Sequence, residues 1–216
     1  MALSTIGANQ LALTSAAMPA GSVLQCVTTN YSNDFIFSLS ASGNASDNGK
    51  LEVATGLNCS ITPISTSSKV LYQATVYIGA NLWYDIGIHV IKNATATTAT
   101  TSHTDTSPCG GSYLSDSSGN AIRGQTSNST PRGTGLVNTY FVAGSSATTG
   151  NYTIAPFSCS LLDHPNTTSQ ITYNFAISWY AWENYNLYLN RTSENQQQAL
   201  YDTNPVSTVT LMEIAG

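Results

Sequence analysis

Hydrophobic and polar residues alternate along much of this chain, which is the pattern of half-buried β-strands. The longest run extends from Ile171 to Trp179, and every second residue in it is apolar. A second run, from Val70 to Ile78, has the same period. Further strands are expected at residues 22–28, 35–40, 57–62, 84–91, 152–162, 186–191 and 207–214. About nine or ten such strands, separated by turn residues, predict an all-β antiparallel sandwich of jelly-roll type.

Three segments depart from the alternation. Residues 94–132 are rich in Thr, Ser and Gly, so we expect a long loop with one short strand near Tyr113 or near Ala121 and Ile122. Residues 194–201 could form a helical turn or two. Residues 1–20 are small and weakly apolar, and Pro19 with Gly21 marks a break after them. We therefore divide the chain into an extended N-terminal segment, 1–20, and a β-sandwich domain, 21–216.

The composition narrows the possible functions. Only 8% of the 216 residues are charged, 41% are hydrophobic and the net charge is −5. The six Lys and Arg residues are scattered singly, so we expect no nucleic-acid partner. We also expect no secretory signal and no membrane insertion, because no apolar run approaches the length of a membrane helix. Four cysteines permit two disulfides, but for a reducing cytoplasm we favour free thiols, with Cys26, Cys59 and Cys159, each in a strand-like run, buried.

Catalytic and metal-binding patterns are weak throughout the sequence. His89 is expected on the polar face of a strand, in an exposed or turn-stabilising role, and the neighbours Asp163 and His164 in a turn are not placed to act together. No pair stands out among the carboxylates that glycoside cleavage would need. Those considered are Asp85, Asp163, Glu183 and Asp202. Glu52 and Glu213 are interpreted as surface or inter-subunit contacts. We therefore predict no enzyme, with no catalytic residue, no metal and no cofactor.

Aromatic residues form the one constellation that favours a binding role. Trp179 continues the apolar face of its strand and is expected in the core. The candidate contact residues lie beside it or after a turn, and they are Trp83, Tyr84, Tyr180, Trp182 and Tyr185. Such side chains suit a subunit interface, ordinary surface packing, or contact with a glycan or receptor.

Four segments resemble recurrent pieces of bacteriophage virion proteins. They are MALSTIGANQ at the start, PAGSVLQ at Pro19–Gln25, LNCSITPISTSSKVLYQATVYI at Leu57–Ile78 and STVTLMEIAG at Ser207–Gly216. The similarity is to the tail-fibre and head-fibre kind, in which a short N-terminal segment leads into an all-β C-terminal domain. The resemblance covers both ends and one central strand pair, and residues 94–146 lie outside it.

The resemblance implies a non-enzymatic structural or adhesive virion protein, made in the host cytoplasm. Its N-terminal segment would bind other virion proteins, and its β domain would attach to a host surface glycan or receptor, or decorate the particle. Fibre-type proteins are commonly homotrimers. The apolar pairs Val209–Leu211 and Met212–Ile214 of the last strand independently indicate burial on both faces. A carbohydrate-binding module and a glycan-degrading, tailspike-like enzyme are the alternatives.

Overall fold

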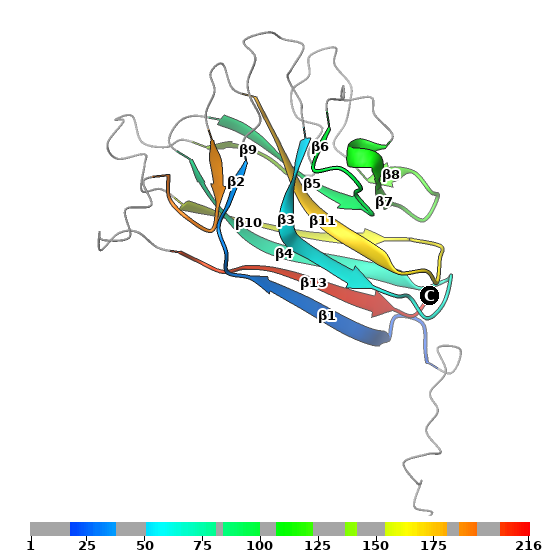
Figure 1. Cartoon of the computed structure of the whole chain (residues 1–216). Helices are drawn as coiled ribbons and strands as arrows, with labels where there is room; N and C mark the ends of the chain where they lie inside the picture. Colours follow the sequence, from blue (N-terminus) through cyan, green and yellow to red (C-terminus); the bar gives the residue numbers. More distant parts are fainter. Residues whose placement is uncertain are drawn as a thin grey trace, which may run out of the picture.

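The computed structural model describes residues 18–37, 51–80, 84–99, 107–122, 137–141, 154–180, 186–193 and 204–216. Within these residues the chain forms two antiparallel β-sheets, here called sheet A and sheet B, with no α-helix. One short 3-10 helix, η3 (Pro108–Gly110), interrupts the strands. The two sheets lie one above the other (Figure 1). The all-β class and the antiparallel sheets predicted from the sequence are confirmed.

Sheet A contains the two strands nearest the ends of the chain. β1 (Val23–Tyr31) pairs with β13 (Ser207–Ile214), which pairs with β4 (Lys69–Ala80), and β4 pairs along its other edge with β10 (Ile154–Asp163). Beyond β13, β4 also pairs with β12 (Leu187–Leu189), and β12 with β2 (Phe35–Phe37). Gly21 and Ser22 exchange backbone hydrogen bonds with Ala215. The described chain therefore begins and ends at the same end of the sandwich, here called the terminal end.

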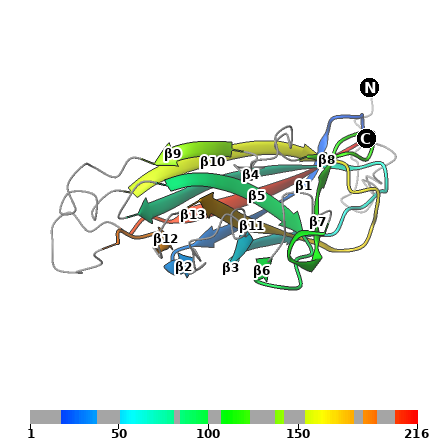
Figure 2. The same cartoon turned by 90° about the horizontal axis from the view of Figure 1, so that it is seen from above.

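Sheet B is built around β11 (Ile171–Tyr180), which pairs with β3 (Leu51–Ile61) on one edge and β5 (Tyr84–Lys92) on the other. β5 pairs in turn with β9 (Val137–Phe141) and β7 (Ser112–Ser115). Short strands β6 (Thr98–Ala99) and β8 (Ala121–Ile122) extend the edges. Seen from above, the axes of the long strands in the two sheets are nearly aligned with one another (Figure 2). This arrangement encloses one core between the sheets.

The core is formed by the inward rows that the alternation predicted. Tyr72 of β4 and Tyr173 of β11 are both fully buried, and their ring centroids are 6.1 Å apart. The rest of the row in β4, from Val70 to Ile78, is buried at every second residue. Burial of this apolar surface is the main stabilising contribution to the fold.

β3 is longer than the sequence analysis indicated, because it begins at Leu51 and not at Leu57. Gly56 lies inside it with φ +97°, and a Cβ there would approach the Tyr31 ring to 2.6 Å. The pairing with β11 shifts register next to this point. Glycine therefore marks a bulge inside the strand, whereas a sequence pattern treats it as a break.

The 94–132 stretch contains more structure than one short strand. β6, η3, β7 and β8 all fall within it, and strand β9 follows, which the sequence analysis did not predict. Strand β13 has the bounds expected for it, whereas the strand expected at 186–191 is limited to Leu187–Leu189. The N-terminal residues 1–17 and the helical turn expected at 194–201 lie outside the described residues.

Candidate functional site

The outer face of sheet A consists of residues that point away from the core on β10, β4, β13 and β1. Strand register aligns them in four rows across the sheet. The two rows farther from the terminal end are Ser158–Thr75–Thr208–Asn30 and Ser160–Gln73–Thr210–Thr28, here called the hydroxyl half. The other two are Leu162–Leu71–Met212–Cys26 and Lys69–Ile214–Val23, here called the apolar half. Of the residues in these rows only Lys69 is charged, so this face carries almost none of the protein's charge.

The hydroxyl half forms an open depression of about 460 Å³. Its lining residues are Gln73, Ala74, Thr75, Ser158, Cys159, Ser160, Thr208 and Thr210. Thr75 and Ser158 share a hydrogen bond of 3.1 Å between their hydroxyls, and Thr28 and Thr210 share another of 3.1 Å. Burial raises the pKa of the Cys159 thiol to about 11, so this lining residue stays neutral. The depression therefore presents neutral donors and acceptors.

The apolar half exposes hydrophobic side chains within a single chain. Leu162 is 41% exposed and Val23 52% exposed, while Leu71, Met212 and Ile214 are half-buried. In β13 these residues alternate with Val209 and Leu211, which are fully buried. The two apolar rows expected in the last strand therefore lie on opposite faces, as predicted. One belongs to the core, and the other lies on a surface patch of a kind that marks interaction sites.

The outer face of sheet B is covered by the chain itself. Tyr113 and Cys109, from the segment around η3 and β7, pack on Val53, Ile91 and Ala176 of the sheet. Figure 1 shows η3, β7 and β8 over sheet B, on the side away from sheet A. Cys109 has φ 52°, a left-handed conformation that turns the chain back onto the sheet. The long Thr- and Gly-rich segment thus supplies a lid for this face.

His89 is part of that covered face, and its expected exposed position is wrong. It is 1% exposed and Nε2 lies 2.8 Å from the Ser178 hydroxyl, while the Tyr113 ring is 6.4 Å away. Burial lowers the pKa of His89 to about 3, so the imidazole is neutral. The sequence pattern correctly placed His89 on the face away from the core, but could not show that the chain returns to cover it.

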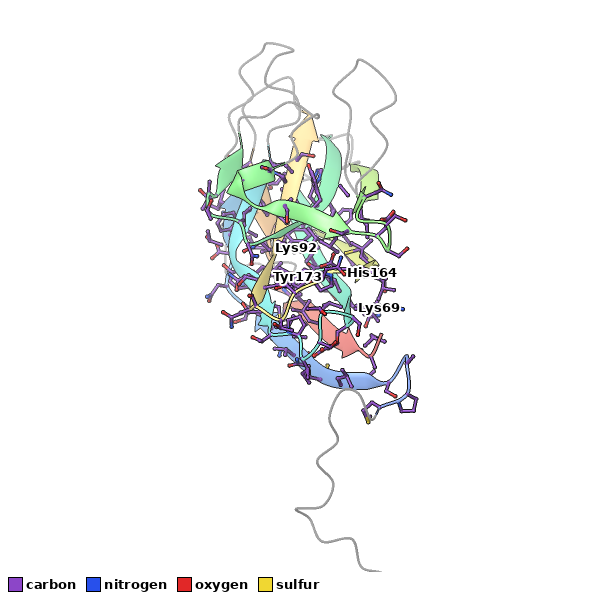
Figure 3. The ribbon with its side chains drawn as sticks, turned by 90° about the vertical axis from the view of Figure 1, so that its right-hand side faces the viewer. Lys69, Lys92, His164 and Tyr173 are labelled. Carbon is purple, nitrogen blue, oxygen red and sulfur yellow. The ribbon has the colours of Figure 1, made fainter. Side chains whose placement is uncertain are left out.

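A buried charged cluster lies at the terminal end of the sandwich. Lys92 Nζ is 3.0 Å from Asp163 Oδ1, and this carboxylate accepts two further hydrogen bonds of 2.6 Å, from the Tyr173 hydroxyl to Oδ2 and from the Ser115 backbone N–H to Oδ1. Lys92 also donates to the Ser115 hydroxyl at 3.3 Å. In Figure 3, Lys92 and Tyr173 lie next to each other in the interior, and His164 and Lys69 lie farther out.

Three of the carboxylates considered in the sequence, Asp163, Glu213 and Glu52, are buried in the structure. Asp163 is fully buried and engaged by three residues other than His164. Glu213, expected as a surface or inter-subunit contact, is also fully buried, where it accepts hydrogen bonds from the Gln25 side chain at 2.5 Å and the Ile64 backbone at 2.7 Å. Glu52, expected likewise, is only 6% exposed. A surface position was therefore wrong for both, because period-two alternation does not distinguish a solvated acid from a buried one.

Two of the candidate aromatic contacts, Tyr84 and Tyr180, have a described backbone, and it lies at the end of the sandwich opposite the terminal end. The backbone of Tyr84 begins β5, and Tyr180 ends β11 beside it, in register with Asp85. The structure thus brings these two positions to neighbouring strand ends. Their side chains, that of Trp179, and residues Trp83, Trp182 and Tyr185 lie outside the described part of the molecule. The roles assigned to them stay predictions.

The four cysteines are free thiols, and they differ in exposure. Cys59 and Cys109 are buried and Cys159 is half-buried, but Cys26 is exposed on the apolar half. The expectation of a buried Cys26 was therefore wrong. Burial raises the pKa of the Cys59 thiol, which keeps it in the unreactive neutral form.

The residues that define these sites gave only partial signals in the sequence. Leu162, Leu71 and Lys92 were not singled out, because alternation alone does not show which outward residues of different strands form one patch. The two-sided apolar pattern of β13 was the usable signal.

Comparison with protein-family models and with curated protein sequences gives no match. In the described residues, no helix is long and apolar enough to cross a membrane.

Proposed function

We propose that this chain is a non-enzymatic structural protein of a bacteriophage virion, of the fibre or adhesin kind, that functions as a homotrimer. Residues 1–20 would bind other virion proteins, and the β domain would attach to a host surface or decorate the particle after synthesis in the host cytoplasm. The strand orders β1-β13-β4-β10 and β3-β11-β5-β9 favour a jelly-roll topology for this domain.

The observation that carries the proposal is the outer face of sheet A, which holds Lys69 as the one charged residue of its four rows and whose apolar half lacks a cover among the described residues. A protein with net charge −5 repels its own copies unless the contacting surfaces avoid that charge. The outward rows hold no carboxylate. This face can therefore pack against a different surface of the next copy, as a closed three-fold ring requires, and the exposed Leu162 and Val23 give it apolar surface to bury.

The oligomeric state of the purified chain tests this proposal. Light scattering coupled to size separation should give a trimer for the natural sequence and a folded monomer for Leu162→Asp, which replaces an exposed apolar side chain of the apolar half with a carboxylate. The matched control is Ile36→Asp, because Ile36 is 42% exposed in β2, away from the apolar half. The control should remain trimeric. A monomeric natural chain at micromolar concentration would contradict the assembly.

The virion role needs its own measurement. Phage particles assembled in the presence of the full chain should contain it after purification. Particles assembled in the presence of the chain without residues 1–20 should lack the truncated chain, although its β domain keeps its thermal stability. A truncated domain that fails to fold would instead make the segment part of the sandwich. Full incorporation without residues 1–20 would contradict their attachment role.

A second candidate is a carbohydrate-binding module, which the hydroxyl half favours. Its depression of about 460 Å³ offers hydroxyl and amide groups, and neutral sugars are recognised by such groups in shaped pockets. Glycan-array binding by monomeric Leu162→Asp, lost on Gln73→Ala, would support this function. Binding that needs the trimer and survives Gln73→Ala would favour the fibre proposal.

A further inference from the structure

We infer that Lys92 and Asp163 are the two ends of an intramolecular isopeptide bond, formed by the protein on itself, which links sheet B to sheet A. The two residues are 71 positions apart in the sequence. Lys92 ends β5 in sheet B and Asp163 ends β10 in sheet A. The proposal is independent of the function proposed above, since it rests on the contacts of this buried cluster alone.

The geometry provides the proximity that the reaction needs. The Lys92 amine is in hydrogen-bond contact with the carboxylate, at 3.0 Å from Oδ1, and the side chains are 9% and 0% exposed. Lys92 and Tyr173 are direct cross-strand partners, so both side chains point inward at Asp163 from neighbouring strands. Holding two reactants in contact in this way replaces a bimolecular encounter and provides a large effective concentration.

Amide formation needs a neutral amine and a neutral acid, because an ion pair of the two does not react. One proton passing from Nζ to Oδ1 along the existing hydrogen bond of 3.0 Å would give both neutral forms within the site, without a proton exchanged with solvent. The exclusion of water also opposes the reverse reaction, hydrolysis of the amide.

The remaining contacts fit the steps of amide formation. The neutral Lys92 nitrogen attacks Asp163 Cγ, and negative charge develops on Oδ2, where the Tyr173 hydroxyl already donates a hydrogen bond of 2.6 Å. Collapse restores the carbonyl at Oδ2. Oδ1, with its proton and a second one from the nitrogen, leaves as water. One N–C bond forms, one C–O bond breaks, and no oxidant or other reactant is needed.

Tyr173 is a hydrogen-bond donor in this scheme and not the acid that loses a proton. Burial and the neighbouring carboxylate raise the pKa of its hydroxyl, so it remains protonated. The Ser115 hydroxyl, 3.3 Å from Nζ, and the Ser115 backbone N–H keep the amine and carboxyl aligned. The product amide would keep the hydrogen bond from Tyr173 to Oδ2.

Intact mass of the purified full chain, denatured and fully reduced, tests the bond directly. The expected mass is that of the sequence less one water, and fragmentation of a protease digest should give a branched peptide joining Lys92 to Asp163. Lys92→Met should have the full mass of its own sequence. Asp163→Asn should yield the same linked product as the natural chain, because ammonia leaves in place of water.

Two further results decide the inference. Tyr173→Phe, which retains the buried ring, should show a mixture of linked and unlinked chains that shifts toward the linked form over time. A folded natural chain with the full mass of its sequence would show that the pair is an ordinary ion pair and overturn the proposal. If Lys92→Met also has a mass one water below that of its sequence, the water is lost at another position, and this result would equally overturn the proposal.

Discussion

The two outer faces of the sandwich differ in whether other residues of the same chain cover them. The outer face of sheet B carries Ile91, Val53 and His89, and residues 107–115 fold back to bury them. The outer face of sheet A carries Leu71, Leu162 and Met212, and these remain exposed or half-buried. Both faces have apolar residues at outward positions of regular strands. The apolar outward residues of sheet B thus have a cover from the same chain, whereas those of sheet A have none among the described residues.

The difference in cover between the two faces also separates residues that stabilise the fold of a single chain from residues that would stabilise the contact between copies. Residues under the lid of sheet B contribute to the folding of a single chain, because their apolar area is buried whether or not copies meet. Residues on the apolar half of sheet A contribute fully only after a partner covers them. Substitutions of similar size on the two faces should thus affect different measurements.

The largest expected effect is on the covered face. Ile91→Ala removes a side chain that is 0% exposed and should lower the free energy of unfolding by about 2–5 kcal/mol, as buried large-to-small substitutions do. Urea unfolding of the monomeric Leu162→Asp background measures this without a contribution from assembly. A loss below about 1 kcal/mol, the size expected for a half-exposed side chain, would show that the lid does not exclude water from Ile91.

Acidification should weaken the covered face selectively. The pKa of His89 is about 3 in the folded chain and 6.5 as the ordinary value, so the unfolded chain binds one more proton between these limits. The contribution of His89 to stability is therefore complete above pH 6.5 and is lost as the pH falls toward 3, at about 1.4 kcal/mol per pH unit. The difference in unfolding free energy between the natural chain and His89→Gln, measured from pH 7 to pH 4, isolates this slope. Parallel curves for the two proteins would contradict a buried, neutral His89.

Leu71→Ala tests the uncovered face with a smaller expected effect. Leu71 is half-buried, so in the monomeric background the substitution should cost roughly 1 kcal/mol of unfolding free energy. In the otherwise natural sequence it should also weaken trimer formation, seen as a higher midpoint concentration for dissociation. A loss in the monomer as large as that for Ile91→Ala would remove the distinction between the faces.

The smallest effect is expected in the hydroxyl half. Thr210→Val removes the exposed hydrogen bond of 3.1 Å to Thr28 and should change the unfolding free energy by no more than about 0.5 kcal/mol. Thermal unfolding of the monomeric background is sufficient to measure it. A change above about 1 kcal/mol would mean that the hydroxyl rows support the fold of the single chain.

The fold was largely readable from the sequence, and the sites were not. Strands β4, β11 and β13 have β-branched and aromatic residues at period two, and this local pattern is enough to predict a strand and its faces. The bulge at Gly56 was missed because glycine is also a common residue at the ends of strands, so a glycine in the sequence does not distinguish a bulge from a break. Alternation is a property of one strand, so it could not show that the lid around Tyr113 returns over His89.

Contacts between distant strand ends were equally beyond the sequence pattern. Lys92 ends an apolar row in β5, and Asp163 ends one in β10, 71 residues later. Their meeting depends on the two strands ending at the same end of opposite sheets. That fact belongs to the topology and not to any local segment. Of the aromatic candidates, the backbones of Tyr84 and Tyr180 lie at neighbouring strand ends, and the contacts of all five stay predictions.

The pairing of β1 with β13 determines how the domain would respond to force. A load applied between Gly21 and the opposite end of the sandwich runs along the strand axes. The backbone hydrogen bonds of this pair lie across that direction, so from Val23 to Tyr31 they are sheared together and not opened one at a time. Strands loaded in this way resist extension until the whole ladder fails at once, and the domain would hold its length under tension up to that point.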